Sequence, residues 1–187
     1  LRNMIKEKET IGILSIEASE AGIGIVSGDK FEVIRVLTSG IAGKHRSGGQ
    51  SARRFERLRN MELNSFYHRV ADNANQILLD EYKSKGIIVS GPGPTKNNFL
   101  KEEYLDYRLQ NNLLAIFDTS YAGEEGLRET VKKADDVLSG LRLMEEKKLV
   151  QKFLREVNKD VGLATYGFDD IKKGLLSSSI DTILIID

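Results

Sequence analysis

The segment at residues 39–50 concentrates the residues whose types could do chemistry. It holds four glycines in twelve positions, and two of them, Gly48 and Gly49, stand directly before Gln50. Adjacent glycines permit positive φ angles and let the backbone approach a ligand closely. A glutamine amide is neither an acid nor a base at neutral pH, so Gln50 offers hydrogen bonds and the placement of a water molecule. The spacing predicts a loop whose tip binds and orients a ligand.

Basic side chains stand on both sides of this tip. Lys44, His45 and Arg46 precede it, and four arginines follow it against the single acid Glu56. The four are Arg53, Arg54, Arg57 and Arg59. Because Ser51 can cap a helix, the first arginines fall near a helix N-terminus, where each cation opposes the helix dipole at a cost of about 0.3–1 kcal/mol. Free N–H groups at such an end favour phosphate, so the pattern indicates a basic tip that meets a polyanion.

Composition narrows the class of protein without naming a partner. The 187 residues suffice for one large domain, or for one domain and part of a second. Lys and Arg number 28 and so do Asp and Glu, so the overall charge says nothing about nucleic acid. The absence of cysteine excludes disulfides and thiolate metal sites and suits a reducing cytosol. No apolar run approaches the length of a membrane span, and no signal peptide opens the chain. A start at Leu1 and an end at Asp187, directly after an apolar run, lead us to expect a fragment of a longer protein.

Periodicity predicts the elements that carry the loop. Alternating residues predict a hairpin at 11–17 and 22–26 and a third strand at 31–37. A long helix is expected from Ser51 to about Lys85, with one buried stripe. That stripe comprises Phe55, Leu58, Phe66, Val70, Ala74, Ile77 and Leu78.

The second half of the chain alternates strands and helices. We expect strands at 86–90 and 113–117, a turn at 91–96 that enters a helix, and a helix over 124–158 interrupted near Gly140. The last residues, 166–187, predict a helix and then a strand. The pattern is typical of an α/β fold. It predicts a mixed β-sheet flanked by helices, with a projecting Gly-Gly-Gln loop that is poorly ordered when free, followed by a partial second α/β unit. The expected domains are residues 1–139 and 140–187.

The loop and its surroundings resemble the archaeal–eukaryotic class I peptide chain release factors. Gly48-Gly49-Gln50 matches their Gly-Gly-Gln motif, and Arg46-Ser47, in place of the Gly-Arg of many eukaryotic members, indicates the archaeal branch. Further matching runs follow in the expected order along nearly the whole chain. They are Lys44-His45, Ser51 to Arg59, Tyr107-Arg108-Leu109, Asp118 to Glu124, Glu145 to Leu149, and Gly167-Phe168-Asp169-Asp170.

The resemblance implies a function in translation termination in the cytoplasm. Residues 1–139 would be the peptidyl-tRNA hydrolysis domain, and residues 140–187 the N-terminal part of a third domain that binds a translational GTPase of the elongation-factor class as a heterodimer partner. Gly48, Gly49 and Gln50 would act at the ribosomal peptidyl-transferase centre, and Gln50 would be the substrate of a Gln methyltransferase. The basic residues Lys44, His45, Arg46, Arg53, Arg54 and Arg57 would contact RNA. The resemblance implies no cofactor, no metal, no membrane and no stand-alone enzyme, since ribosomal RNA supplies most of the catalytic apparatus.

Two other functions compete with this hypothesis. A non-hydrolytic ribosome-rescue factor of the Pelota type shares the architecture but lacks the Gly-Gly-Gln motif. A nuclease or NTPase would need clustered carboxylates around a metal, or a complete phosphate loop. Residues 91–96 depart from that loop motif, Asp118 is a lone carboxylate at a strand end, and His68 is expected to be a surface or packing residue.

Overall fold

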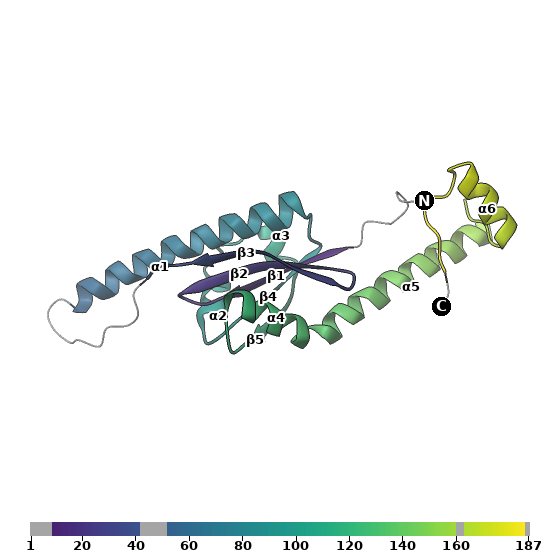
Figure 1. Ribbon diagram of the computed structural model, residues 1–187. Helices are drawn as coiled ribbons and strands as arrows, with labels where there is room; N and C mark the ends of the chain where they lie inside the picture. The colour runs from purple at the N-terminus through teal and green to yellow at the C-terminus, as the bar shows by residue number, and fades with distance from the viewer. Residues whose placement is uncertain (1–8, 42–51, 160–162, 186–187) are drawn as a thin grey trace. The chain divides into compact units, whose positions relative to one another are not determined.

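The computed structural model describes residues 9–41, 52–159 and 163–185 (Figure 1). The chain divides into two compact units, Glu9–Val137 and the residues from 138 onward. None of the helices in the described ranges combines the length and the apolarity that a bilayer crossing requires.

The first unit is built on a five-stranded mixed sheet in the order β3-β2-β1-β4-β5. Its strands are β1 (Thr10–Ile16), β2 (Glu20–Ser27), β3 (Lys30–Thr38), β4 (Gly86–Gly91) and β5 (Leu113–Asp118). The first three pair antiparallel, whereas β4 runs parallel to β1 and β5 parallel to β4. Gly28, at a φ of 58°, makes the tight turn between β2 and β3. The predicted hairpin, third strand and mixed sheet are confirmed.

Helices cover both faces of this sheet. They are α1 (Ala52–Asn75), η1 (Gln76–Glu81), α2 (Thr95–Lys101), α3 (Tyr107–Gln110) and α4 (Gly123–Lys133). Side chains alternate along β1, so Gly12 and Ser15 face opposite sides of the sheet. Gly12 lies beneath Leu78 of η1, and a Cβ on this glycine would lie 2.7 Å from the leucine Cδ1. On the other face, Ser15 lies against Gly126 of α4. The α1–η1 side and the α4 side are therefore separate layers.

The long helix after the loop ends in a π-helical segment that its sequence pattern does not predict. The N–H of Tyr82 donates to the carbonyl oxygen of Ile77 at 3.0 Å, a spacing of five residues. The wider turn lets the adjacent side chains of Ile77 and Leu78 both reach the core, where each is fully buried. Gly12 makes room for the second of them.

The predicted interruption near Gly140 is wrong. The break falls at Ala134, between α4 and α5 (Asp135–Lys159), and Gly140 lies inside α5. Ala134 is fully buried, and the Nζ of Lys133 donates to the carbonyl oxygen of Asp118 at 2.6 Å, so the end of α4 is held on the sheet. A glycine in an exposed helix costs only about 0.5–1 kcal/mol, which is too little to end α5.

The second unit contains the rest of α5 and α6 (Phe168–Leu176). The predicted helix in the tail is confirmed, but the strand after it is not, because residues 179–185 pair with no other strand in the described part of the chain. A strand needs a partner for its backbone N–H and C=O groups. No residue of α6 is buried.

Candidate nucleic-acid interface

The predicted site divides between residues that the structure describes and residues that it does not. Gly48, Gly49 and Gln50, with Lys44, His45 and Arg46, lie in the range 42–51, outside the described residues. The described chain leaves β3 at Thr38, continues to Ile41 and resumes at Ala52, the first residue of α1. The site is therefore characterised by the two segments that border this range. We call them the stems: the first is the end of β3 with residues 39–41, and the second is α1.

The second stem presents the predicted arginines to solvent. Arg53, Arg54 and Arg57 lie exposed in the first turns of α1, and the first turn contains no acidic residue. The helix thus begins with cations beside its positive dipole end. Such an end attracts an anion more strongly than an ordinary helix start, and contact with a polyanion stays a prediction.

Only the C-terminal half of α1 packs on the sheet. Its buried residues begin at Phe66 and continue through Val70 and Ala74, whereas Phe55 and Leu58, predicted as core residues, are 66% and 44% exposed. The reason is length: at about 1.5 Å per residue the 24-residue helix spans about 36 Å. The seven-residue β1 spans about 23 Å. Figure 1 shows the N-terminal half of α1 extending past the strands.

Hydrogen bonds clamp the two stems together where the sheet ends. The guanidinium of Arg69, in α1, donates to the carbonyl oxygen of Thr38, the last residue of β3. One turn further along α1, the Oδ1 of Asn73 accepts from the guanidinium of Arg35, in β3. The guanidinium carbon of Arg69 also lies 5.3 Å from the ring centroid of Phe66. These contacts fix the direction in which both stems leave the sheet.

An aromatic cluster contacts α1 at the turn where its buried residues begin. Tyr104, between α2 and α3, accepts a 2.7 Å hydrogen bond from the amide of Asn64 and meets the ring of His68 edge-on at 4.9 Å between centroids. Its ring also stacks on Phe99 at 5.5 Å, and Tyr67 completes the group. Desolvation on burial raises the pKa of the Tyr67 phenol above its ordinary value, although a hydrogen bond with Thr95 opposes the shift. His68 is exposed and its ring lies against Tyr104, so it is a surface residue with a packing contact, within the prediction of a surface or packing residue.

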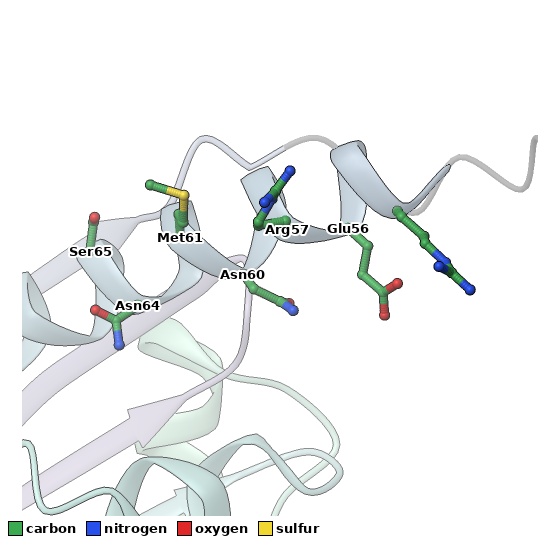
Figure 2. A pocket seen from close by; sticks show the side chains of 7 residues that line it. Glu56, Arg57, Asn60, Met61, Asn64 and Ser65 are labelled. Atoms are coloured by element: carbon green, nitrogen blue, oxygen red, sulfur yellow. The ribbon is translucent and has the colours of Figure 1, made fainter. Parts of the chain in front are cut away.

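A polar groove runs along the N-terminal half of α1, which we call the free half. Arg53, Glu56, Arg57, Asn60, Met61, Asn64 and Ser65 line it. Figure 2 shows Glu56 and Asn60 pointing to one side of the helix and Met61 to the other. Guanidinium and amide groups donate hydrogen bonds to phosphate and to base edges. The groove therefore presents donors of the kind that such contacts use, and its described lining contains one carboxylate, Glu56, rather than the pair that hydrolytic metal sites require.

The strand-end carboxylate of Asp118 has a structural partner. Its Oδ1 lies 2.6 Å from the Nζ of Lys96, which also donates to the carbonyl oxygen of Gly93. Lys96 is almost fully buried while Asp118 is exposed, so the ion pair ties the turn after β4 to the end of β5. The hydrogen bond from Lys96 lowers the pKa of this carboxyl. Within the described ranges, no three His, Asp or Glu side chains gather as metal ligands.

Sequence reasoning missed the residues that orient the stems. Arg69 and Thr38 are 31 positions apart, and Asn64 and Tyr104 are 40 apart. No local pattern links such pairs, because the contacts depend on how α1 crosses the sheet. The exposure of Phe55 had one available signal, since it stands among four arginines in a seven-residue run.

Comparison with known proteins places the chain in a family and agrees with the fold. Models of eRF1 domain 2 and eRF1 domain 3 match residues 10–140 and 143–187. A peptide chain release factor subunit 1 from Pyrococcus abyssi is 45% identical over 99% of this chain and 45% of its own length. The chain thus spans less than half the length of the curated relatives it matches.

Solved structures also show the similarity in fold. The crystal structure of the archaeal translation termination factor aRF1 matches with a TM-score of 0.58 and 29% identity, over 89% of this chain and 46% of that one. A ribosome-bound archaeal Pelota shares the fold, with a TM-score of 0.53 and 23% identity, over 95% of this chain and 47% of that one. With two family models in register and relatives aligned over almost all its residues, the chain belongs to the family of archaeal–eukaryotic class I peptide chain release factors.

Proposed function

We propose that this chain is the part of a class I release factor that promotes hydrolysis of the peptidyl-tRNA ester when a stop codon is reached. The observation that carries the proposal is the 45% identity to a peptide chain release factor subunit 1 over 99% of the chain. The Gly-Gly-Gln sequence at 48–50 gives this similarity a chemical meaning.

In the proposed reaction, water attacks the ester carbonyl and negative charge develops on the carbonyl oxygen. The backbone N–H of Gln50 donates a hydrogen bond to that oxygen, and one such donor is worth about 10²–10³ in rate. Gly48 and Gly49 let the main chain come close, since a Cβ in a left-handed conformation costs roughly 1–2 kcal/mol. The side chain of Gln50 positions the water. Ribosomal RNA provides the remaining groups, so the protein acts within the ribosome and is not a stand-alone enzyme.

The described stems support this role because they form an arm. The buried half of α1 is anchored in the core and clamped to β3, while its other half carries Arg53, Arg54 and Arg57 away from the sheet. These arginines, with Lys44, His45 and Arg46, would bind RNA phosphates. Each lost phosphate contact would lower the slope of log affinity against log salt by about 0.7–0.9.

The proposal assigns partners to the rest of the chain. Residues 1–139 form the hydrolysis domain, and residues 140–187 begin a domain that binds a translational GTPase in the cytoplasm. In the described part of the second unit, large apolar side chains are exposed and suit a protein interface. They are Leu143, Met144, Val150, Leu154, Phe168 and Leu176. A Gln methyltransferase would modify Gln50.

The test is peptide release from stop-codon-programmed ribosomes by the full-length factor, comparing wild type with Gly49→Ala. We expect release to collapse while ribosome binding persists. Gly140→Ala is the matched control, because a Cβ at position 140 would meet no atom within 4 Å. If wild type releases no peptide, or Gly49→Ala releases as well as wild type, the proposal fails. A wild type that binds ribosomes without releasing peptide would favour the Pelota-like rescue function.

A further inference from the structure

Three large apolar side chains lie in an exposed row on the free half of α1. They are Phe55, Leu58 and Met61, which are 66%, 44% and 62% exposed. Residues three apart in a helix are neighbours on its surface, so the three form one continuous strip. We call this strip the apolar row. The periodicity that predicts core residues here is real, but the sheet does not reach this far.

Arginines border the apolar row on both edges. Helical spacing places Arg54 and Arg57 along one edge and Arg59 beside Phe55 on the other. The acid Glu56 points to the side of Asn60, away from Met61 (Figure 2). Four of the seven residues from 53 to 59 are arginines. The apolar strip therefore lies in a field that attracts a polyanion.

The row continues into a hollow on the anchored side. Leu58, Met61 and Phe66 of α1, together with Ile41 from the end of the first stem, line a groove of about 480 Å³. Small-molecule sites range from roughly 300 to 1,000 Å³, so the groove has room for an unstacked nucleobase. The cation of Arg69 and the carboxylate of Glu62 also line the groove, so the positive charge near the row comes from the arginines at 53–59.

We propose that the apolar row receives an unstacked RNA base, with the ring of Phe55 stacking on it. Arg54, Arg57 and Arg59 hold the flanking phosphates. Aromatic rings set among cations bind single-stranded nucleic acid in this way, because every base has a face that can stack. Sequence-specific RNA recognition likewise uses unpaired bases stacked on aromatic side chains or guanidinium planes. The inference rests on the proposed function and adds to it a base contact on α1, outside the range 42–51.

The first experiment identifies what lies against the row. Phe55→p-benzoylphenylalanine in the full-length factor, bound to stop-codon-programmed ribosomes, is irradiated and the crosslinked product is digested. We expect a ribonuclease-sensitive adduct with RNA. An adduct with a ribosomal protein alone, or one within the factor itself, would overturn the inference.

The second experiment measures what the ring contributes. Phe55→Ala is expected to raise the half-saturating factor concentration for peptide release by about fivefold to a hundredfold, the range for one base stack. The loss should appear there rather than in the maximal rate, and without a change in the salt slope, because no phosphate contact is removed. Phe55→Tyr keeps the ring and should restore binding. Tyr107→Ala removes another exposed aromatic, 69% exposed on α3, and should have no effect.

The outcomes separate this inference from the proposed function. If wild type releases peptide and Phe55→Ala requires no higher concentration, the base contact is wrong while the release function stands. A Phe55→Ala effect that Phe55→Tyr does not restore would also refute stacking. Equal thermal midpoints for the variants exclude misfolding as the cause.

Discussion

The clamp between Arg69 and Thr38 gives the sharpest test of how the arm is held. Arg69→Ala removes a charged hydrogen bond to the carbonyl oxygen of Thr38 and the contact with the ring of Phe66. Hydrogen bonds to charged groups contribute about 1.5–3 kcal/mol net, and an exposed cation–π contact about 0.5–1 kcal/mol. Because Arg69 is exposed, solvent competes for it. We therefore expect a loss of about 1–3 kcal/mol in the free energy of unfolding.

Urea denaturation followed by circular dichroism measures this loss directly. Arg128→Ala is the matched control, since Arg128 is an exposed arginine whose pair with Glu124 is an i,i+4 surface contact worth about 0.3–0.5 kcal/mol. Arg69→Lys keeps the charge but lacks the planar fork and should recover part of the loss. In the full-length factor, Arg69→Ala should also slow release at saturating concentration, because the stems lose their direction.

A result near the control value would refute this reasoning. If Arg69→Ala changes the unfolding free energy no more than Arg128→Ala does, the hydrogen bond to Thr38 holds nothing in solution. If stability falls but saturated release is unchanged, the clamp stabilises the fold without orienting the loop.

Two further predictions concern the sheet and its helices. The hydrogen bond from Lys96 lowers the pKa of Asp118 below its ordinary 3.8. The pair should therefore stabilise the fold fully above about pH 3.8, and this contribution should be lost as pH falls through the lowered pKa. Asp118→Asn should flatten that part of an acid-denaturation profile, and an unaltered profile would contradict the assignment. Gly126→Ala should lower the unfolding free energy by about 1–3 kcal/mol, since its Cβ would clash with the Oγ of Ser15 and with the carbonyl group of Tyr121, whose carbon would lie 3.0 Å away. Gly140→Ala, in open space, should instead raise helix stability by about 0.4–1 kcal/mol. Equal thermal shifts in the same direction would show that the packing argument is wrong.

The arrangement of anchors explains why α1 is built from two unlike halves. Its C-terminal half buries Phe66, Val70 and Ala74. The hydroxyl of Tyr104 accepts a hydrogen bond from the amide of Asn64 just before burial begins. N-terminal to Phe66, none of the described side chains of α1 is buried. A helix with one end fixed in a core can carry a loop to a distant target without relying on the loop for rigidity.

The sequence by itself determined the features that depend on neighbouring residues. Alternation over a few positions predicts β1, β2 and β3, and glycines beside basic residues predict the character of the loop. Residues 91–96 can likewise be excluded as a phosphate loop from the sequence alone, because the spacing of their glycines and lysine differs from that of the phosphate-loop motif. Such signals survive without a fold, since backbone preference and side-chain chemistry act within a few residues.

Only the tertiary structure decided what each helical face meets. The apolar spacing of Phe55 and Leu58 is the same whether a sheet lies beneath them or not, and burial ends where the strands end. The break at Ala134 rather than at Gly140 likewise depends on tertiary structure, since Ala134 is fully buried and the neighbouring Lys133 donates to the carbonyl oxygen of Asp118 at the end of β5. The clamp from Arg69 to Thr38 joins residues 31 positions apart. The periodicity of a sequence predicts which side of a helix is apolar. The length and position of the sheet on which the helix packs determine how much of that side is buried.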